Sequence, residues 1–193
     1  MPNFDASTGQ CLVRIYREGL AAAVGHDLVL KVGAFSVEVD THAPRISAQF
    51  QADSLRVLGT QEEYARAADP QTMTSAALSA RDRAKIESSM QKKVLETARF
   101  PVIRFESTGV SAGDASDILE VRGTLNLHGV ERAISVSVKG DAEASVARVR
   151  LHQPDFGIEP FRALMGALKV QADVEIELRL GLGFDALKGA ANR

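Results

Sequence analysis

Apolar and polar residues alternate with a period of two over much of this chain, most clearly in residues 168–182. In that segment every second residue from Leu168 to Leu182 is apolar, and most residues between them are polar or charged. Successive side chains of a β-strand point to opposite faces, so the pattern predicts one long strand with a single apolar face. Its length of roughly 45 Å favours a strand that curves around a small domain.

The same alternation predicts further strands, for a total of about eight. They cover residues 11–18, 28–39, 45–52, 102–110, 119–127, 134–138 and 145–151. A sheet with one apolar face needs a cover for that face, and closure on itself is the simplest one. The expected fold class is therefore mainly β, an antiparallel barrel of about eight strands. A barrel of this size is either filled by its side chains or holds one small or elongated ligand.

One helix is predicted between the strands, over residues 79–99. Ser79 is its expected N-cap, with Asp82 three residues later as in a capping box, and Pro101 ends it. Its positive charge is expected to face solvent, with contact to an anion or a lipid surface as the alternative. Residues 56–77 are interpreted as a long loop or short helical excursion and residues 185–193 as a frayed tail. The whole of 1–193 is expected to be one domain with a core at about 11–182.

The charge balance of 23 basic and 25 acidic residues argues against a nucleic-acid partner. The single cysteine, Cys11, cannot form an internal disulfide and is expected to be a buried, inert thiol. No apolar run approaches the roughly 20 residues of a membrane-spanning helix. Residues 1–10 lack a positive region followed by an apolar one, which predicts a cytoplasmic location.

Catalytic and cofactor motifs are not found in the sequence. The four histidines, His26, His42, His128 and His152, lack the spacing of metal ligands, and no metal or other cofactor is predicted. We expect His26, next to Asp27, to make a structural hydrogen bond at a strand start, and His128 to fix a hairpin turn. The chain contains no nucleophile elbow, phosphate-binding glycine loop or dinucleotide fingerprint.

Residues 153–167 form a loop rich in proline, glycine and large apolar residues, including Phe156 and Phe161. Its apolar groups must be buried. The loop could fold over the barrel mouth as a gate or plug the core, and the plug is the favoured interpretation.

Four segments together resemble the YceI-like family: ARFPVIRFEST (98–108), GTLNLHGVERAISVSV (123–138), PDFGI (154–158) and VEIELRL (174–180). The resemblance implies a lipocalin-like barrel crossed by a helix, whose apolar tunnel binds a polyisoprenoid or similar long amphiphile. Two features depart from the family pattern, an apparent insertion at 56–77 and the segment GLAAAVGHDL at 19–28. Both favour a cytoplasmic branch of the family, although many members are exported.

The leading hypothesis is a non-enzymatic protein that binds, carries or stores a long apolar ligand inside the barrel. The predicted ligand-binding residues are Phe105, Val121, Leu125, Leu127, Val136, Val149, Leu151, Val174 and Ile176, with Phe156 and Phe161 near an opening. One alternative is an enzyme acting on a hydrophobic substrate in the same cavity through His26 and Asp27 or His128. Another is an interaction module with a filled core. The sequence leaves open whether the protein forms a homodimer.

Overall fold

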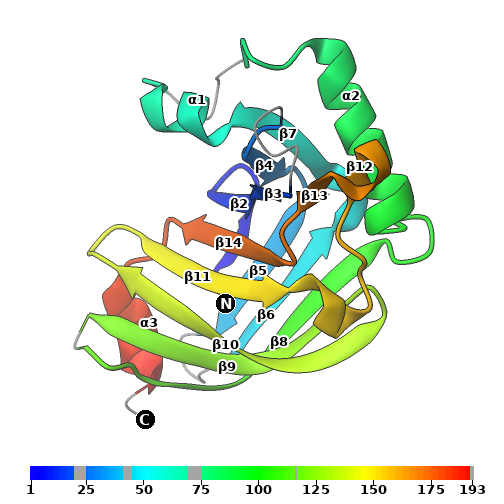
Figure 1. The fold of residues 1–193 in the computed structure, drawn as a ribbon. Helices are drawn as coiled ribbons and strands as arrows, with labels where there is room; N and C mark the ends of the chain where they lie inside the picture. The colour runs from blue at the N-terminus through cyan, green and yellow to red at the C-terminus, as the bar shows by residue number, and fades with distance from the viewer. Residues whose placement is uncertain (20–24, 41–44, 69–74, 116, 192–193) are drawn as a thin grey trace.

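The structure is a computed structural model that describes residues 1–19, 25–40, 45–68, 75–115 and 117–191 (Figure 1). The main element of the fold is one antiparallel sheet with the strand order β1-β5-β6-β8-β9-β10-β11-β14-β2-β4-β7. Its strands are β1 (Asn3–Asp5), β2 (Gly9–Ile15), β4 (Leu28–Val32), β5 (Phe35–Asp40), β6 (Arg45–Gln51), β7 (Leu55–Thr60), β8 (Val102–Ala112), β9 (Ile118–Leu127), β10 (Val130–Gly140), β11 (Ser145–His152) and β14 (Asp173–Leu180). A small second sheet contains β12 (Arg162–Ala163), β13 (Leu168–Val170) and β3 (Arg17–Glu18).

The large sheet curls into a half-barrel whose two ends are joined by a corner (Figure 1). β4 turns into β5 at Gly33 and Ala34, and β6 turns into β7 through η2 (Ala52–Ser54). The Gly33 N–H donates to the Ser54 carbonyl at 3.0 Å, and the Ala34 N–H donates to the Ser54 hydroxyl at 3.0 Å. The predicted antiparallel class is confirmed, but the strand number differs. The segment predicted as one strand over 28–39 is bent into two, and β1 and β7 were not predicted.

The segment 168–182 is not one strand, which corrects the sequence prediction. β13 ends at Val170, and β14 begins at Asp173 in the other sheet. Between them, the Gln171 N–H donates to the Tyr16 carbonyl and the Ala172 carbonyl accepts from the Gln153 N–H, at 2.8 and 2.9 Å. These hydrogen bonds to neighbouring loops replace strand pairing between Val170 and Asp173. The chain therefore passes from the small sheet to the large sheet at this point, instead of continuing as one curved strand.

The predicted helix is present but shorter than expected. α2 (Ala80–Ser89) continues into a π-helical turn, η3 (Met90–Val94). The Ser79 hydroxyl accepts from the Asp82 N–H at 3.1 Å, which confirms the N-cap. The helix ends before the expected Arg99, because Glu96 has a φ of 43°, in the left-handed region that stops a helix.

The described part of residues 56–77 contains the short helix that one of the two interpretations expected, and also a strand that neither expected. It begins with most of β7, in which Leu55 and Val57 are buried, and continues into α1 (Gln61–Arg66). α1 starts with a complete capping box between Thr60 and Glu63. The short alternation of Leu55, Val57 and Gly59 was too brief to stand out from the polar residues around it. Residues 69–74 lie outside the described part of the chain.

The tail is also more ordered than predicted, because residues 184–191 form α3 (Phe184–Ala191). Phe184 and Leu187 are buried at its apolar side, and the Phe184 N–H donates to the Asp141 carbonyl at 2.8 Å. Burial of these two side chains holds the segment in place, although its small and charged residues are typical of a frayed chain end. α3 covers the end of the half-barrel that lies opposite α1 and α2 (Figure 1).

Candidate functional site: an apolar cavity

A cavity of about 570 Å³ occupies the interior of the half-barrel. Every strand of the large sheet except β1 contributes inward-facing side chains to its wall. α2 and η3 border one end through residues such as Ile86 and Met90, and Leu187 of α3 borders the other. The volume lies within the range of about 300 to 1,000 Å³ that is usual for small-molecule sites. The inward side chains of this barrel therefore leave part of the interior open.

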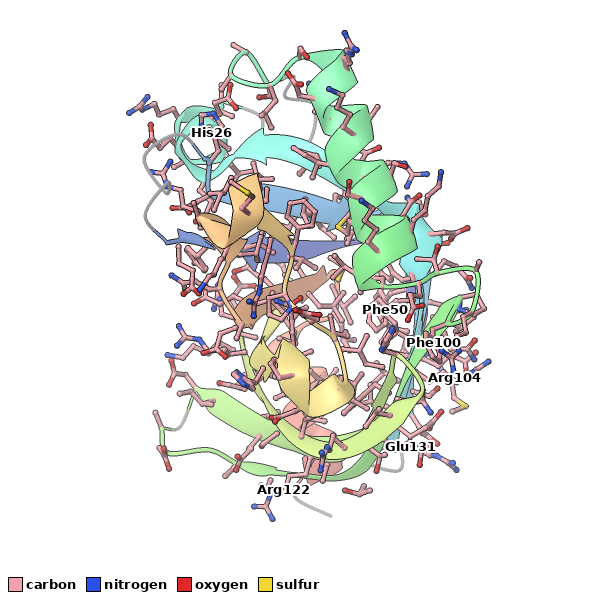
Figure 2. All side chains as sticks on the ribbon, turned by 45° about the vertical axis from the view of Figure 1, so that its right-hand side comes forward. His26, Phe50, Phe100, Arg104, Arg122 and Glu131 are labelled. Atoms are coloured by element: carbon pink, nitrogen blue, oxygen red, sulfur yellow. The ribbon has the colours of Figure 1, made fainter. Side chains whose placement is uncertain are left out.

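Ten of the eleven predicted ligand-binding residues line this cavity, nine of them from the alternation and Phe161 from the loop. They are Phe105, Val121, Leu125, Leu127, Val136, Val149, Leu151, Phe161, Val174 and Ile176. Cross-strand register explains why they meet: Phe105 lies opposite Leu125, Val121 opposite Val136, and Val149 opposite Ile176. Polar residues on the same strands point outward, as Figure 2 shows for Arg122 and Glu131. Contact of the ten residues with a ligand stays a prediction.

Phe156 is not at an opening, which corrects its predicted position. It is 2% exposed and packs into the core, away from the cavity wall. η4 (Gln153–Phe156) ends at Gly157, whose φ of 68° reverses the chain and directs Phe156 inward. Ile158 and Phe161 of the same loop do line the cavity, while Met165 is fully exposed. The loop therefore fills part of the core and walls part of the cavity.

Several wall residues were missing from the predicted set. Ile86, Met90 and Val94 line the cavity from α2 and η3, and Leu187 lines it from α3. The spacing of Leu78, Ile86, Met90 and Val94 along one helical stripe could have indicated these wall residues. An apolar stripe on a helix normally faces the interior of the protein. Nothing in the local sequence showed that the stripe covers open space.

Some polar wall residues lie where the cavity approaches the surface, at side chains that are exposed or half-buried, and we call this region the cavity mouth. They include His26 and the cationic side chains Arg17, Lys85 and Lys169. The Arg17 guanidinium donates to the Gly25 carbonyl and lies 3.8 Å from the Asp27 carboxylate, which also accepts from the Arg17 N–H at 2.8 Å. Figure 2 places His26 at the same end of the molecule as α2.

The histidines make the following contacts. His26 is exposed, and its side chain has no hydrogen bond within the described residues, so the expected structural bond at the strand start is not seen. His128 and Gly129 have φ of 55° and 76°, the values of a two-residue hairpin turn, which confirms the turn. His128 Nε2 lies 3.2 Å from Glu96, away from the cavity wall, and His152 pairs with Asp173 on the outer surface. His42 lies outside the described residues.

Cys11 lines the cavity and is almost completely buried. Burial raises the pKa of the Cys11 thiol to about 12, so the group stays protonated at neutral pH. Within the described ranges, no cluster of three or more histidine, cysteine, aspartate or glutamate residues could hold a metal ion. None of the helices in those ranges is long and apolar enough to cross a bilayer.

The family profile of the YceI-like domain matches residues 24–182, which include most of the half-barrel. The chain belongs to the YceI-like family. A comparison with curated proteins finds no matching relative for this YceI-like protein.

Two solved structures share the fold at low sequence identity. The crystal structure of Burkholderia cenocepacia BcnA matches with a TM-score of 0.61 and 12% identity, over 91% of this chain and 97% of BcnA. A polyisoprenoid binding domain from Saccharophagus degradans, implicated in plant cell wall breakdown, matches with a TM-score of 0.53 and 13% identity, over 90% and 96%. These likenesses establish the lipocalin-like fold of this YceI-like protein.

Proposed function

We propose that this YceI-like protein binds a long apolar or amphiphilic molecule, of the polyisoprenoid type, in the cavity and carries or stores it unchanged. The observation that supports the proposal most is the continuous apolar wall of the cavity, from α2 at one end to α3 at the other. Removing a methylene group from water contributes about 0.8 kcal/mol, so a long chain gains affinity along the whole wall.

Binding without chemical conversion is supported by the distribution of the ionisable groups. Acid–base catalysis needs a positioned group with a suitable pKa within hydrogen-bond reach of the substrate. His26 is the histidine at the mouth, and no aspartate or glutamate among the described residues lines the cavity beside it. Asp27, its neighbour in the sequence, accepts from Arg17 instead.

The fold likeness adds a second line of support. One of the structures that shares this fold is described as a polyisoprenoid binding domain. A chain of linked isoprene units is apolar and flexible, which suits a long cavity lined by aliphatic side chains.

The direct test is native mass spectrometry of the purified protein, followed by uptake of geranylgeraniol by the emptied protein. We expect a co-purified amphiphile, or saturable uptake with one molecule per chain, and recovery of the molecule with unchanged mass. Absence of both a co-purified molecule and any uptake would overturn the proposal. Recovery of a chemically altered molecule would favour the enzymatic alternative.

A pair of variants on β11 makes the test specific for the cavity. Val149 lines the cavity, whereas Val146 on the same strand does not. Val149→Phe places extra volume in the cavity and should weaken geranylgeraniol uptake at least about tenfold. Val146→Phe makes the same change outside the wall and should leave uptake within about twofold of the wild type. Equal effects of the two variants would contradict binding inside the half-barrel.

A further inference from the structure

We propose that the ligand carries an anionic head group, a carboxylate or a phosphate, held at the cavity mouth by Lys85 and Lys169. The inference rests on the proposed function, because it assigns the polar end of a ligand whose apolar part lies in the cavity. Two observations support the inference: the charged side chains at the mouth are positive, and some of them have no ion-pair partner among the described residues.

Among the described residues, the charged side chains that line the cavity are all basic. They are Arg17, Lys85 and Lys169, and within the described part of the chain no aspartate or glutamate joins them. The protein as a whole has a slight acidic excess, with a formal charge of −2, so this bias is local. A ligand that enters past these groups meets a positive potential, which attracts an anion and disfavours a cation.

Two of the three cations have no counter-ion within the described ranges. Arg17 lies against Asp27, with 3.8 Å between Nε and the carboxylate oxygen. Lys85 and Lys169, by contrast, have no carboxylate within ion-pair distance among residues 1–19, 25–40, 45–68, 75–115 and 117–191. Glu18 lies directly opposite Lys169 in the β3–β13 register, but the two side chains form no ion pair. Arg17 is thus a neutralised neighbour, and the two lysines are available to a ligand.

The two lysines come from different elements at the mouth. Lys85 lies in α2, on the side of the cavity that also has Ile86, Ser89 and Met90. Lys169 lies in β13, with Leu168 and Val170 beside it in the wall. Figure 2 shows α2 on one side of the upper half of the molecule and the segment with β12, the partner of β13, on the other. Both lysines thus line the same cavity from different elements.

The surroundings of Lys169 favour binding of an anion by its ammonium group. Its side chain is half-buried beside apolar wall residues, and a partly desolvated ammonium without a partner lowers stability. A carboxylate or phosphate would restore the lost interaction through charge-assisted hydrogen bonds, which are stronger than those between neutral groups. An alcohol of the same chain length would supply a weaker, uncharged acceptor.

The test compares matched ligand pairs by isothermal titration calorimetry at pH 7.4 and low salt. The pairs are dodecanoate with dodecanol and farnesyl phosphate with farnesol, so that each anion has a neutral partner with the same chain. We expect at least one anion to bind at least about tenfold more tightly than its alcohol. The pair with the larger ratio distinguishes a carboxylate from a phosphate head group. This preference should decline as salt rises from 0.05 to 0.5 M, because salt screens exposed charges.

Two double variants locate the effect. Lys85→Gln with Lys169→Gln should reduce the preference for the anion to within about twofold while the alcohols bind as before. Lys92→Gln with Lys93→Gln removes the same charge from exposed positions of η3 that do not line the cavity, and should keep the preference. Circular dichroism of each variant confirms that it is folded.

The remaining outcomes separate this inference from the proposed function. If each anion and its alcohol bind the wild type equally, the head-group inference is wrong and apolar binding stands. The lysines would then only cover the cavity wall with their methylene stems. If the preference survives in the Lys85 and Lys169 double variant, the assignment of the head group to these two lysines is wrong. If none of the four molecules binds, the proposed function fails as well.

Discussion

Gly123 of β9 lies directly beneath the ring of Phe105 on the neighbouring strand β8. A Cβ atom at Gly123 would lie 2.5 Å from Cζ of Phe105 and would also contact the Glu106 carbonyl oxygen. Because Phe105 is part of the cavity wall, the missing side chain of Gly123 lets this ring lie flat against the sheet. The shape of the cavity therefore depends on a residue that has no side chain.

Gly123→Ala should destabilise the protein by about 1 to 3 kcal/mol, because either the ring or the strand backbone must move. Gly109 of β8 is a matched control, since a Cβ there would meet nothing within 4 Å. Gly109→Ala should leave stability unchanged or raise it by up to about 1 kcal/mol. Urea unfolding of both variants measures the difference, and equal effects would show that Phe105 does not need Gly123.

Leu125→Phe tests whether the interior is open. Leu125 lines the cavity, so the larger ring can enter free space, and we expect a change of less than about 0.5 kcal/mol. The control is Leu12→Phe, the same substitution at a residue that is 1% exposed and does not line the cavity. Overpacking at Leu12 should cost about 1 to 3 kcal/mol. A similar loss at Leu125, measured by thermal or urea unfolding, would mean that the interior is filled.

The carboxylate of Glu63 joins the start of α1 to residues 75–77. Burial alone would raise the pKa of Glu63, but the Ser75 hydroxyl and the backbone N–H groups of Thr60, Ala77 and Ala76 donate to it and lower the pKa to about 2. The ordinary value is 4.5, so the unfolded chain takes up this proton first as the pH falls. Stability from Glu63 is therefore complete above about pH 4.5 and is lost as the pH falls toward 2.

Glu63→Gln should cost about 1 to 3 kcal/mol at pH 7, and the difference from the wild type should narrow as the pH falls below 4.5. The control is Glu62→Gln, since the exposed Glu62 pairs only with the exposed Arg66 at 3.9 Å in the described contacts. That change should stay within about 0.5 kcal/mol. Urea unfolding at several pH values gives both curves, and a Glu63 difference that does not vary with pH would contradict the ionic role.

Cys11 should be unreactive in the folded protein. Burial raises its pKa from 9.0 to about 12, so below pH 9 the thiol is protonated and also shielded from reagents. We expect no labelling by a thiol reagent at pH 8 in buffer and one label per chain in concentrated urea. Between pH 9 and 12 the unfolded thiol ionises first, so folding stability should fall as the pH rises. Rapid labelling of the folded protein would show that the cavity opens to the reagent.

The period-two pattern by itself determined which side chains of this YceI-like protein face inward. Val174 and Ile176 line the cavity as the alternation predicts, although the expected long strand is broken before Asp173. The pattern survives the break because the face of a side chain depends only on its parity within an extended segment. The turn at His128 and Gly129 is equally local, since its residue types favour positive φ.

Only the tertiary structure decided that the inward faces stay apart and leave a cavity of about 570 Å³. The separation of opposite walls depends on the corner at Gly33 and on the helices that cover each end, and these are set by contacts between residues far apart in the sequence. Lys85 and Lys169 border the same cavity for that reason, although 83 residues stand between them in the chain. Periodicity specifies a direction for each side chain, whereas the distance across the half-barrel comes from the packing of the whole fold.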